Sequence, residues 1–162
     1  MSNFEKQQQI LNDFPYQYKS IIVSTVNDDG TPLVSYAPMI FNNHRWYILI
    51  SQMAPHTKNL IRHPQGAGLL VEDESIATSI FFRKRLSFTF SAHLIGSSPE
   101  LTQLFESRHG EMVKMLSSMD FQYWQLIPGE GTIVIGPGQA YTVSPEMTII
   151  KQNGAPGGHN RT

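Results

Sequence analysis

The stretch SIIVSTVNDDGTPLVSYAPMI, residues 20–40, decides the fold. A short β-branched run at residues 20–26 meets an Asp-Gly turn within residues 27–30, and the chain returns over residues 32–40. Asp-Gly is a strong hairpin signal because both positions tolerate positive φ. A second turn leads into RWYILIS at residues 45–51. Three strands joined by tight turns are therefore expected to form an antiparallel meander.

Working outward, the apolar patterns predict further short strands and a few surface helices. Strands are expected at residues 66–72, 85–95, 121–127, 132–135 and 139–143, and helices at 4–14, 55–63, 74–82 and from Ser98 to about Leu116. Ser98-Pro99-Glu100 is typical of a helix start. No G-x-G-x-x-G or Walker A sequence occurs. The chain is therefore expected to be mainly β, an antiparallel closed or partly open barrel with peripheral helices.

Composition limits the class of protein. The chain has 162 residues, of which 40% are hydrophobic and 15% charged, with a net charge of −1 and no cysteine. These values predict one globular domain, and exclude disulfides and thiolate metal sites. They give no general attraction to nucleic acid or to an anionic membrane. Without a signal-like N-terminus or a long apolar run, a cytoplasmic protein is expected.

The barrel domain is expected over residues 1–145, followed by a flexible glycine-rich tail at residues 146–162. His159 lies on this tail. A histidine there is usually disordered, but a tail can also fold over a bound group and supply one ligand to it.

Two polar clusters could bind an anion. The first lies where a strand ends and a helix begins, a place where free N–H groups favour phosphate, and its side chains are Ser51, His56, Thr57 and Lys58. The alternative is that Thr57 caps the helix while His56 and Lys58 are solvated. The second cluster is Arg83-Lys84-Arg85, either a phosphate or propionate site or a solvated edge of the sheet. No ligand spacing for zinc occurs, and His109 is expected on a helix surface.

Six short motifs, in order along residues 15–145, resemble those of the heme-utilisation HugZ/HutZ-like family. They are SYAP at 35–38, ISQ at 50–52 with HTKNL at 56–60, EDE at 72–74, FRKRL at 82–86 and GQAY at 138–141. That family belongs to the FMN-binding split β-barrels related to pyridoxamine 5′-phosphate oxidase. The resemblance implies an antiparallel, Greek-key-like split barrel with peripheral helices, and a homodimer with ligand clefts between its subunits.

The resemblance also implies site residues. In the flavin-binding relatives, the segment that matches Ser51, His56, Thr57 and Lys58 holds the FMN phosphate. His56 stands where pyridoxamine-phosphate oxidases have Lys or Arg. In the heme-utilisation proteins, the matching residues would be His159 as axial heme ligand and Asp120 of the other subunit orienting it. If heme binds, Arg83 and Arg85 could pair its propionates.

Three functions therefore compete. The first is heme binding with oxygen-dependent ring opening, which needs an external electron donor; the second is an FMN-dependent oxidoreductase; the third is a heme or flavin carrier without catalysis. No metal other than heme iron is expected. A homodimer is expected from the resemblance, and from three apolar side chains that would need cover, Trp46, Trp124 and Phe121.

Overall fold

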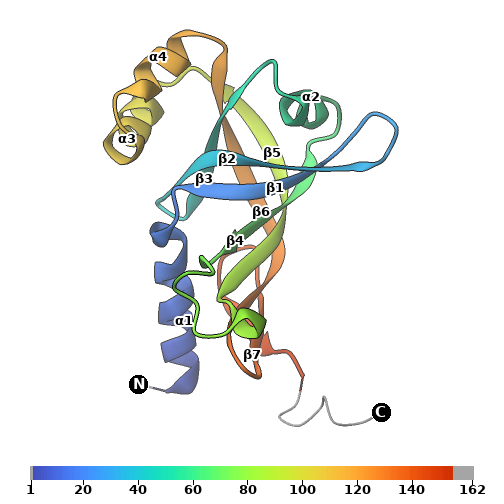
Figure 1. Cartoon of the computed structure of the whole chain (residues 1–162), viewed down its shortest axis with the longest axis vertical. Coiled ribbons are helices and arrows are strands. Elements are labelled where there is room, and N and C mark those ends of the chain that lie inside the picture. The colour runs from blue at the N-terminus through green and yellow to red at the C-terminus, as the bar shows by residue number, and fades with distance from the viewer. Residues whose placement is uncertain (1, 155–162) are drawn as a thin grey trace.

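The three strands predicted around the Asp-Gly turn form one side of an antiparallel barrel (Figure 1). The computed structural model describes residues 2–154. β1 (Ser20–Val26) pairs with β2 (Pro32–Asn42), which pairs with β3 (Arg45–Ser51). Gly30 has φ of +84° in the first turn, a value that glycine adopts without a Cβ clash. The predicted meander is confirmed.

Three more strands close the barrel. β4 (Gln65–Val71) pairs with β1 and β5 (Arg85–Gly96), and β5 pairs with β6 (Phe121–Gly136). Because β6 also pairs with β3, six antiparallel strands form a closed ring. β7 (Gln139–Val143) and β8 (Ile149–Gln152) extend the sheet beyond β6. The mainly β antiparallel barrel is therefore confirmed.

The two strands predicted at 121–127 and 132–135 are a single strand, which corrects that prediction. The intervening Pro-Gly-Glu-Gly resembles a turn in sequence, but β6 continues through it against β5. A Cβ at Gly131 would lie 2.9 Å from the Cβ of Phe88. The glycine is needed because β5 packs too closely for a side chain, and no turn is present.

The helices lie around the barrel. They are α1 (Asn3–Asp13), η1 (Phe14–Gln17), α2 (Pro55–Arg62), η2 (Ile80–Phe82), α3 (Pro99–His109) and α4 (Met112–Ser118). Two predictions are corrected. The helix predicted at 74–82 is only the short η2 after a turn. The long helix from Ser98 breaks into α3 and α4 at Gly110, whose φ is +94°.

The core fills the inside of the barrel, and a smaller apolar cluster around Phe105 and Tyr123 joins α3 and α4 to the sheet. Trp46 and Trp124 are buried in the barrel core and Phe121 is half-buried, so the prediction that they need cover is wrong. The two tryptophan side chains are part of the cluster that fills the barrel. Other apolar side chains are exposed instead, as described below.

The last described strand falls inside the segment predicted as a tail from residue 146. Ile149 is buried, and its N–H donates to Gln8 Oε1 of α1 at 2.9 Å. The sheet therefore extends to Gln152. His159 and the rest of the predicted tail after Gly154 lie outside the described residues. No helix among residues 2–154 is long and apolar enough to cross a membrane.

Candidate functional site

Ser51 and Asp120 meet where β3 ends and β6 begins. The N–H of Gln52 donates to the backbone carbonyl of Asp120 at 3.0 Å, which continues the β3–β6 ladder by one residue. The Ser51 hydroxyl donates to the Asp120 carboxylate. The same Ser51 Oγ accepts from the N–H of Met53 at 3.1 Å. A carboxylate is therefore fixed at the strand end predicted to bind phosphate.

Thr57 is fully buried and serves the same turn. Its hydroxyl donates to the backbone carbonyl of Ser51 at 2.5 Å. The N-cap of α2 is Ala54, which makes no side-chain capping bond, so the alternative of Thr57 as the cap is wrong. With its proton committed to Ser51, the Thr57 hydroxyl holds the strand end against the helix start.

His56 is half-buried beside the second strand. Its Nδ1 lies 2.7 Å from Ser35 Oγ, within hydrogen-bond distance, so the predicted SYAP and HTKNL motifs are in contact. Burial lowers the pKa of His56 below its usual value because the charged imidazole loses solvation. A neutral imidazole attracts a phosphate less than the Lys or Arg of the pyridoxamine-phosphate oxidases.

Lys58 is exposed on α2, and its neighbour Asn59 carries the buried polar contacts of this helix. Asn59 Nδ2 donates to Thr25 Oγ1 at 3.0 Å and to Asn27 Oδ1 at 2.9 Å, and its Oδ1 accepts from Arg62. The sequence predicts no separate role for Asn59, although it belongs to the HTKNL motif. Its contacts tie α2 to the β1–β2 hairpin.

These contacts decide how well the segment fits an FMN phosphate. Of the four predicted donors, Ser51 and Thr57 donate within the protein, and His56 is held largely neutral. The Asp120 carboxylate adds a negative charge that opposes a phosphate dianion at this place. Lys58 remains available. The residues do not fit a tightly bound phosphate.

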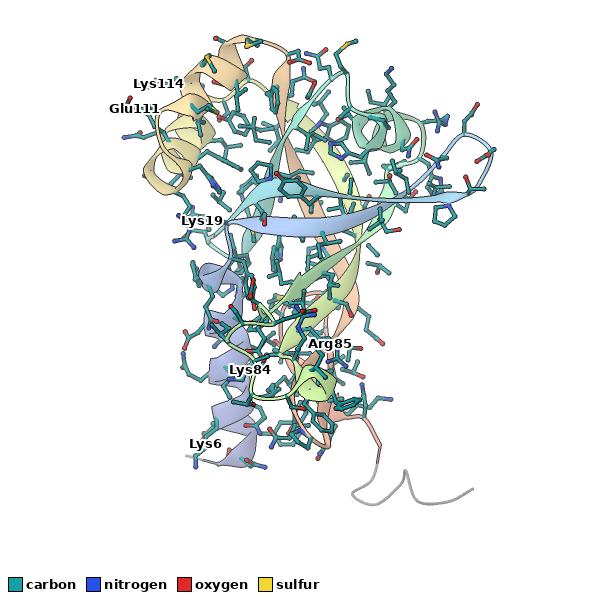
Figure 2. All side chains as sticks on the ribbon, in the orientation of Figure 1. Lys6, Lys19, Lys84, Arg85, Glu111 and Lys114 are labelled. Carbon is teal, nitrogen blue, oxygen red and sulfur yellow. The ribbon has the colours of Figure 1, made fainter. Side chains whose placement is uncertain are left out.

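Arg85 is the first residue of β5, and Arg83 lies two residues before it. Figure 2 shows Lys84 and Arg85 toward the opposite end of the molecule from α3 and α4. Arg83 Nε and Nη2 donate to the carbonyl of Glu72 at 2.9 and 2.7 Å, and Nη1 lies 3.6 Å from Glu74. Arg85 Nη1 donates to the carbonyl of Arg83 at 2.9 Å. Both guanidinium groups are half-buried, with further N–H groups left for a ligand.

An apolar turn precedes this basic cluster. Ile76, Ile80, Phe81 and Phe82 are all exposed, with Phe81 at 79%. Three cationic side chains follow at once. We call residues 76–85 the apolar-basic segment. It combines a large apolar surface with positive charge, which suits an amphipathic anion better than a small polar one.

Tyr18 lines a cavity of about 770 Å³ next to this segment, together with Glu72 and Arg83. Burial, with Glu72 nearby, raises the pKa of Tyr18 to about 12, so its phenol stays protonated and can donate. Sequence reasoning missed Tyr18, since no motif marks it. His109, expected on a helix surface, is instead half-buried against Phe105 with its Nε2 3.1 Å from the Met39 carbonyl.

The predicted site residues thus form two groups. Ser51, Thr57 and Asp120 lie together near α3 and α4, with His56 at the adjoining start of α2. Arg83 and Arg85 form the second group, at the start of β5. The predicted FMN donor Ser51 and the predicted heme-site Asp120 are hydrogen-bonded to each other, which the sequence did not indicate.

This barrel and these motifs match known proteins. Residues 6–144 match the pyridoxamine 5′-phosphate oxidase family. The heme oxygenase HutZ of Vibrio cholerae is 39% identical over 140 residues, which cover 83% of this chain and 79% of HutZ.

Two solved structures are similar to this chain in fold and in sequence. Campylobacter jejuni ChuZ superposes with a TM-score of 0.85 at 30% identity, covering 96% of this chain and 67% of ChuZ. A crystal structure of V. cholerae HutZ, described there as a heme storage protein, gives 0.69 at 33% identity, covering 78% and 91%. The chain therefore belongs to the pyridoxamine 5′-phosphate oxidase-like split barrels, in the branch of the HutZ/ChuZ heme oxygenase-like proteins.

Proposed function

We propose that this protein binds heme and degrades it in an oxygen-dependent reaction that releases iron, as a homodimer with heme between its subunits. The observation that carries the proposal is the apolar-basic segment, residues 76–85. Heme is a large apolar plate with two carboxylates, so it needs an apolar surface beside cations. Exposed Phe81 and Phe82 next to Arg83 and Arg85 supply both. The relative named heme oxygenase supports the same ligand.

The predicted ligand pair belongs to two subunits in this proposal. β6 has 16 residues, roughly 50 Å of contour at about 3.3 Å per residue, and separates Asp120 from β7 and β8. Figure 1 shows β6 running from the α3–α4 end of the molecule to the β7 end. Five residues from Gly154 to His159 reach at most about 18 Å. This arrangement supports pairing of His159 in one subunit with Asp120 of the partner copy.

An exposed apolar face suits the dimer. Ile22 of β1 is opposite Tyr36 of β2 and Leu69 of β4, and Val34 lies next along β2. Val34 is 70% and Tyr36 66% exposed, although strand residues of this kind are usually covered. A second copy on this sheet face would bury them.

Bound heme would supply the iron chemistry toward O2, with electrons from an external donor. The chain's own residues would bind the heme and orient the side chain that ligates it. His159 would ligate the iron, and Asp120 would accept a hydrogen bond from the N–H of the other imidazole nitrogen, fixing the ring. Arg83 and Arg85 would pair the propionates. The Ser51 hydroxyl, which donates to Asp120, holds that carboxylate in place.

A heme carrier without catalysis is the second candidate. One crystal structure of HutZ is described as that of a heme storage protein. Binding and degradation would use the same ligands, so only turnover separates them. The FMN-dependent oxidoreductase has less support, because Asp120 and the internal bonds of Ser51 and Thr57 disfavour a phosphate.

The test is a hemin titration followed in the Soret region, with wild type and His159→Ala, and then incubation with ascorbate or with NADPH and a reductase. We expect a saturable band that shifts in His159→Ala, and loss of the band with iron release when the reductant and O2 are both present. Saturable binding without loss would identify a carrier. No band, together with FMN binding in the same cuvette, would overturn the proposal.

A further inference from the structure

Four methionines are exposed at one end of the molecule. The sequence has seven methionines, and six of them lie within the described residues 2–154. Met39 and Met147 are buried, as methionine usually is. The exposed ones are Met53 at 71%, Met112 at 63%, Met115 at 54% and Met119 at 65%. Figure 2 shows sulfur atoms at the end of the molecule that α4 and the neighbouring turn form.

Three of the four share one face of α4. Met112, Met115 and Met119 are spaced i, i+3 and i+7, which places them within two turns on the same side of a helix. Met119 is the C-cap, and its N–H still donates to the carbonyl of Leu116 at 3.1 Å. Val113 faces the opposite way into the apolar cluster under α3, so α4 packs through its other side.

Met53 joins them from a different part of the chain. The N–H of Gln52 donates to the carbonyl of Asp120 at 3.0 Å, so the backbones of these two residues lie side by side. Met53 is adjacent to Gln52, and Met119 is adjacent to Asp120. The hydrogen bond between these two neighbours therefore brings the backbone of a fourth methionine close to the end of α4.

The chemistry of this group is soft and uncharged. Lys114, the only cation of α4, points to α3, where its Nζ lies 3.4 Å from Glu106. Figure 2 labels Lys114 and Glu111 on the outer side of α4. Thioethers bind Mg²⁺, Ca²⁺ and Zn²⁺ poorly and select Cu(I) among biological metals. Methionine side chains have three rotatable bonds, so their sulfurs can converge on one ion.

We propose that Met112, Met115 and Met119, with Met53, form a binding site for a soft monovalent cation, Cu(I). The site adjoins Asp120 but uses none of the residues proposed to bind heme, and cation binding does not require heme. The long, flexible side chains would wrap the ion with three or four sulfurs, at the surface and without any thiolate. Binding is reversible and involves no redox step.

The test uses the full chain without heme, labelled with ¹³C-methyl methionine, and Ag⁺ as an oxidation-stable probe for Cu(I). We expect the methyl resonances of Met112, Met115, Met119 and Met53 to shift at one equivalent of Ag⁺, while those of Met39 and Met147 stay in place. Unmoved α4 methyl resonances would overturn the site, and would leave an apolar partner surface as the role of the exposed methionines.

Affinity for Cu(I) is then measured in competition with bicinchoninate. The triple variant Met112→Leu, Met115→Leu, Met119→Leu keeps volume and apolar character. We expect it to lose more than roughly 100-fold in affinity, above what loss of a supporting contact alone costs. Met147→Leu, the same change in the core, serves as control and should bind as wild type. Equal affinity of the triple variant and the control would also overturn the site.

Discussion

The Ser51 hydroxyl donates to the Asp120 carboxylate across the ends of β3 and β6. Two residues that sequence resemblance assigns to different ligands are thus parts of one contact. A carboxylate at this position excludes a tight phosphate, and it provides a fixed acceptor for a ligand's N–H. The contact therefore favours the heme proposal over the flavin one.

Asp120→Asn removes the charge and keeps the shape and the contact with Ser51. We expect hemin affinity or heme degradation to fall by about 10-fold to 100-fold, as is typical when the group that orients a metal-bound histidine is lost. Soret titration and iron release measure this. Ser51→Ala should have a smaller effect in the same direction, because it only frees the carboxylate. Unchanged heme properties in Asp120→Asn would remove Asp120 from the site.

Mixed dimers test whether the site spans two subunits. A heterodimer of one His159→Ala chain and one Asp120→Asn chain would hold one intact site if the two residues pair between subunits. It would hold none if they paired within one chain. We expect about half of wild-type heme binding or turnover from purified heterodimers, and little from either variant homodimer. Heterodimers as inactive as the homodimers would contradict pairing between subunits.

The sequence predicted the barrel because alternation and turn residues act locally. Asp29-Gly30 predicts the first hairpin, and the strands within residues 20–51 pair around it as expected. The residues from Pro128 to Gly131 wrongly predict a turn. Glycine is required there because β5, a distant segment of the chain, packs closely against this stretch.

The site divides in the same way. Motifs identified Ser51 and His56, but their partners Asp120 and Ser35 lie 69 and 21 residues away along the chain. Trp46 and Trp124 are predicted to be exposed on a barrel with open edges and so to need cover, whereas both fill its core. Local sequence patterns do not indicate which distant residues will pair or which face of a strand will be covered.

The apolar face of β1 and β2 gives a direct test of the dimer. Tyr36→Glu places a charge on the 66%-exposed ring position and leaves the core untouched. We expect a shift from dimer to monomer in sedimentation velocity, and loss of heme binding with it. Ile61→Glu on α2, a 65%-exposed apolar position, is the matched control and should stay dimeric. A wild type that sediments with the mass of one chain would contradict the interface.

Asn59 should matter for stability more than its exposed neighbour does. Asn59→Ala leaves Thr25, Asn27 and Arg62 without their shared partner in a largely buried place. We expect unfolding free energy to fall by about 1–3 kcal/mol, the usual result of leaving buried polar groups unsatisfied. Urea denaturation measures it, with Lys58→Ala as control, which should change stability by less than about 0.5 kcal/mol. Equal losses would show that the Asn59 contacts do not hold α2.

Two half-buried histidines should make the protein less stable in mild acid. Burial lowers the pKa of His56 and of His109 below the ordinary value of 6.5. As the pH falls below 6.5, the unfolded chain takes up these protons before the folded protein does, so the stability that is complete above pH 6.5 declines toward the folded pKa values. Urea denaturation at about pH 7.5 and about pH 5.5 should show this loss. It should shrink in His56→Gln, His109→Gln, but persist in the control His93→Gln, whose side chain is exposed. An unchanged loss in the double variant would assign the acid sensitivity to other groups.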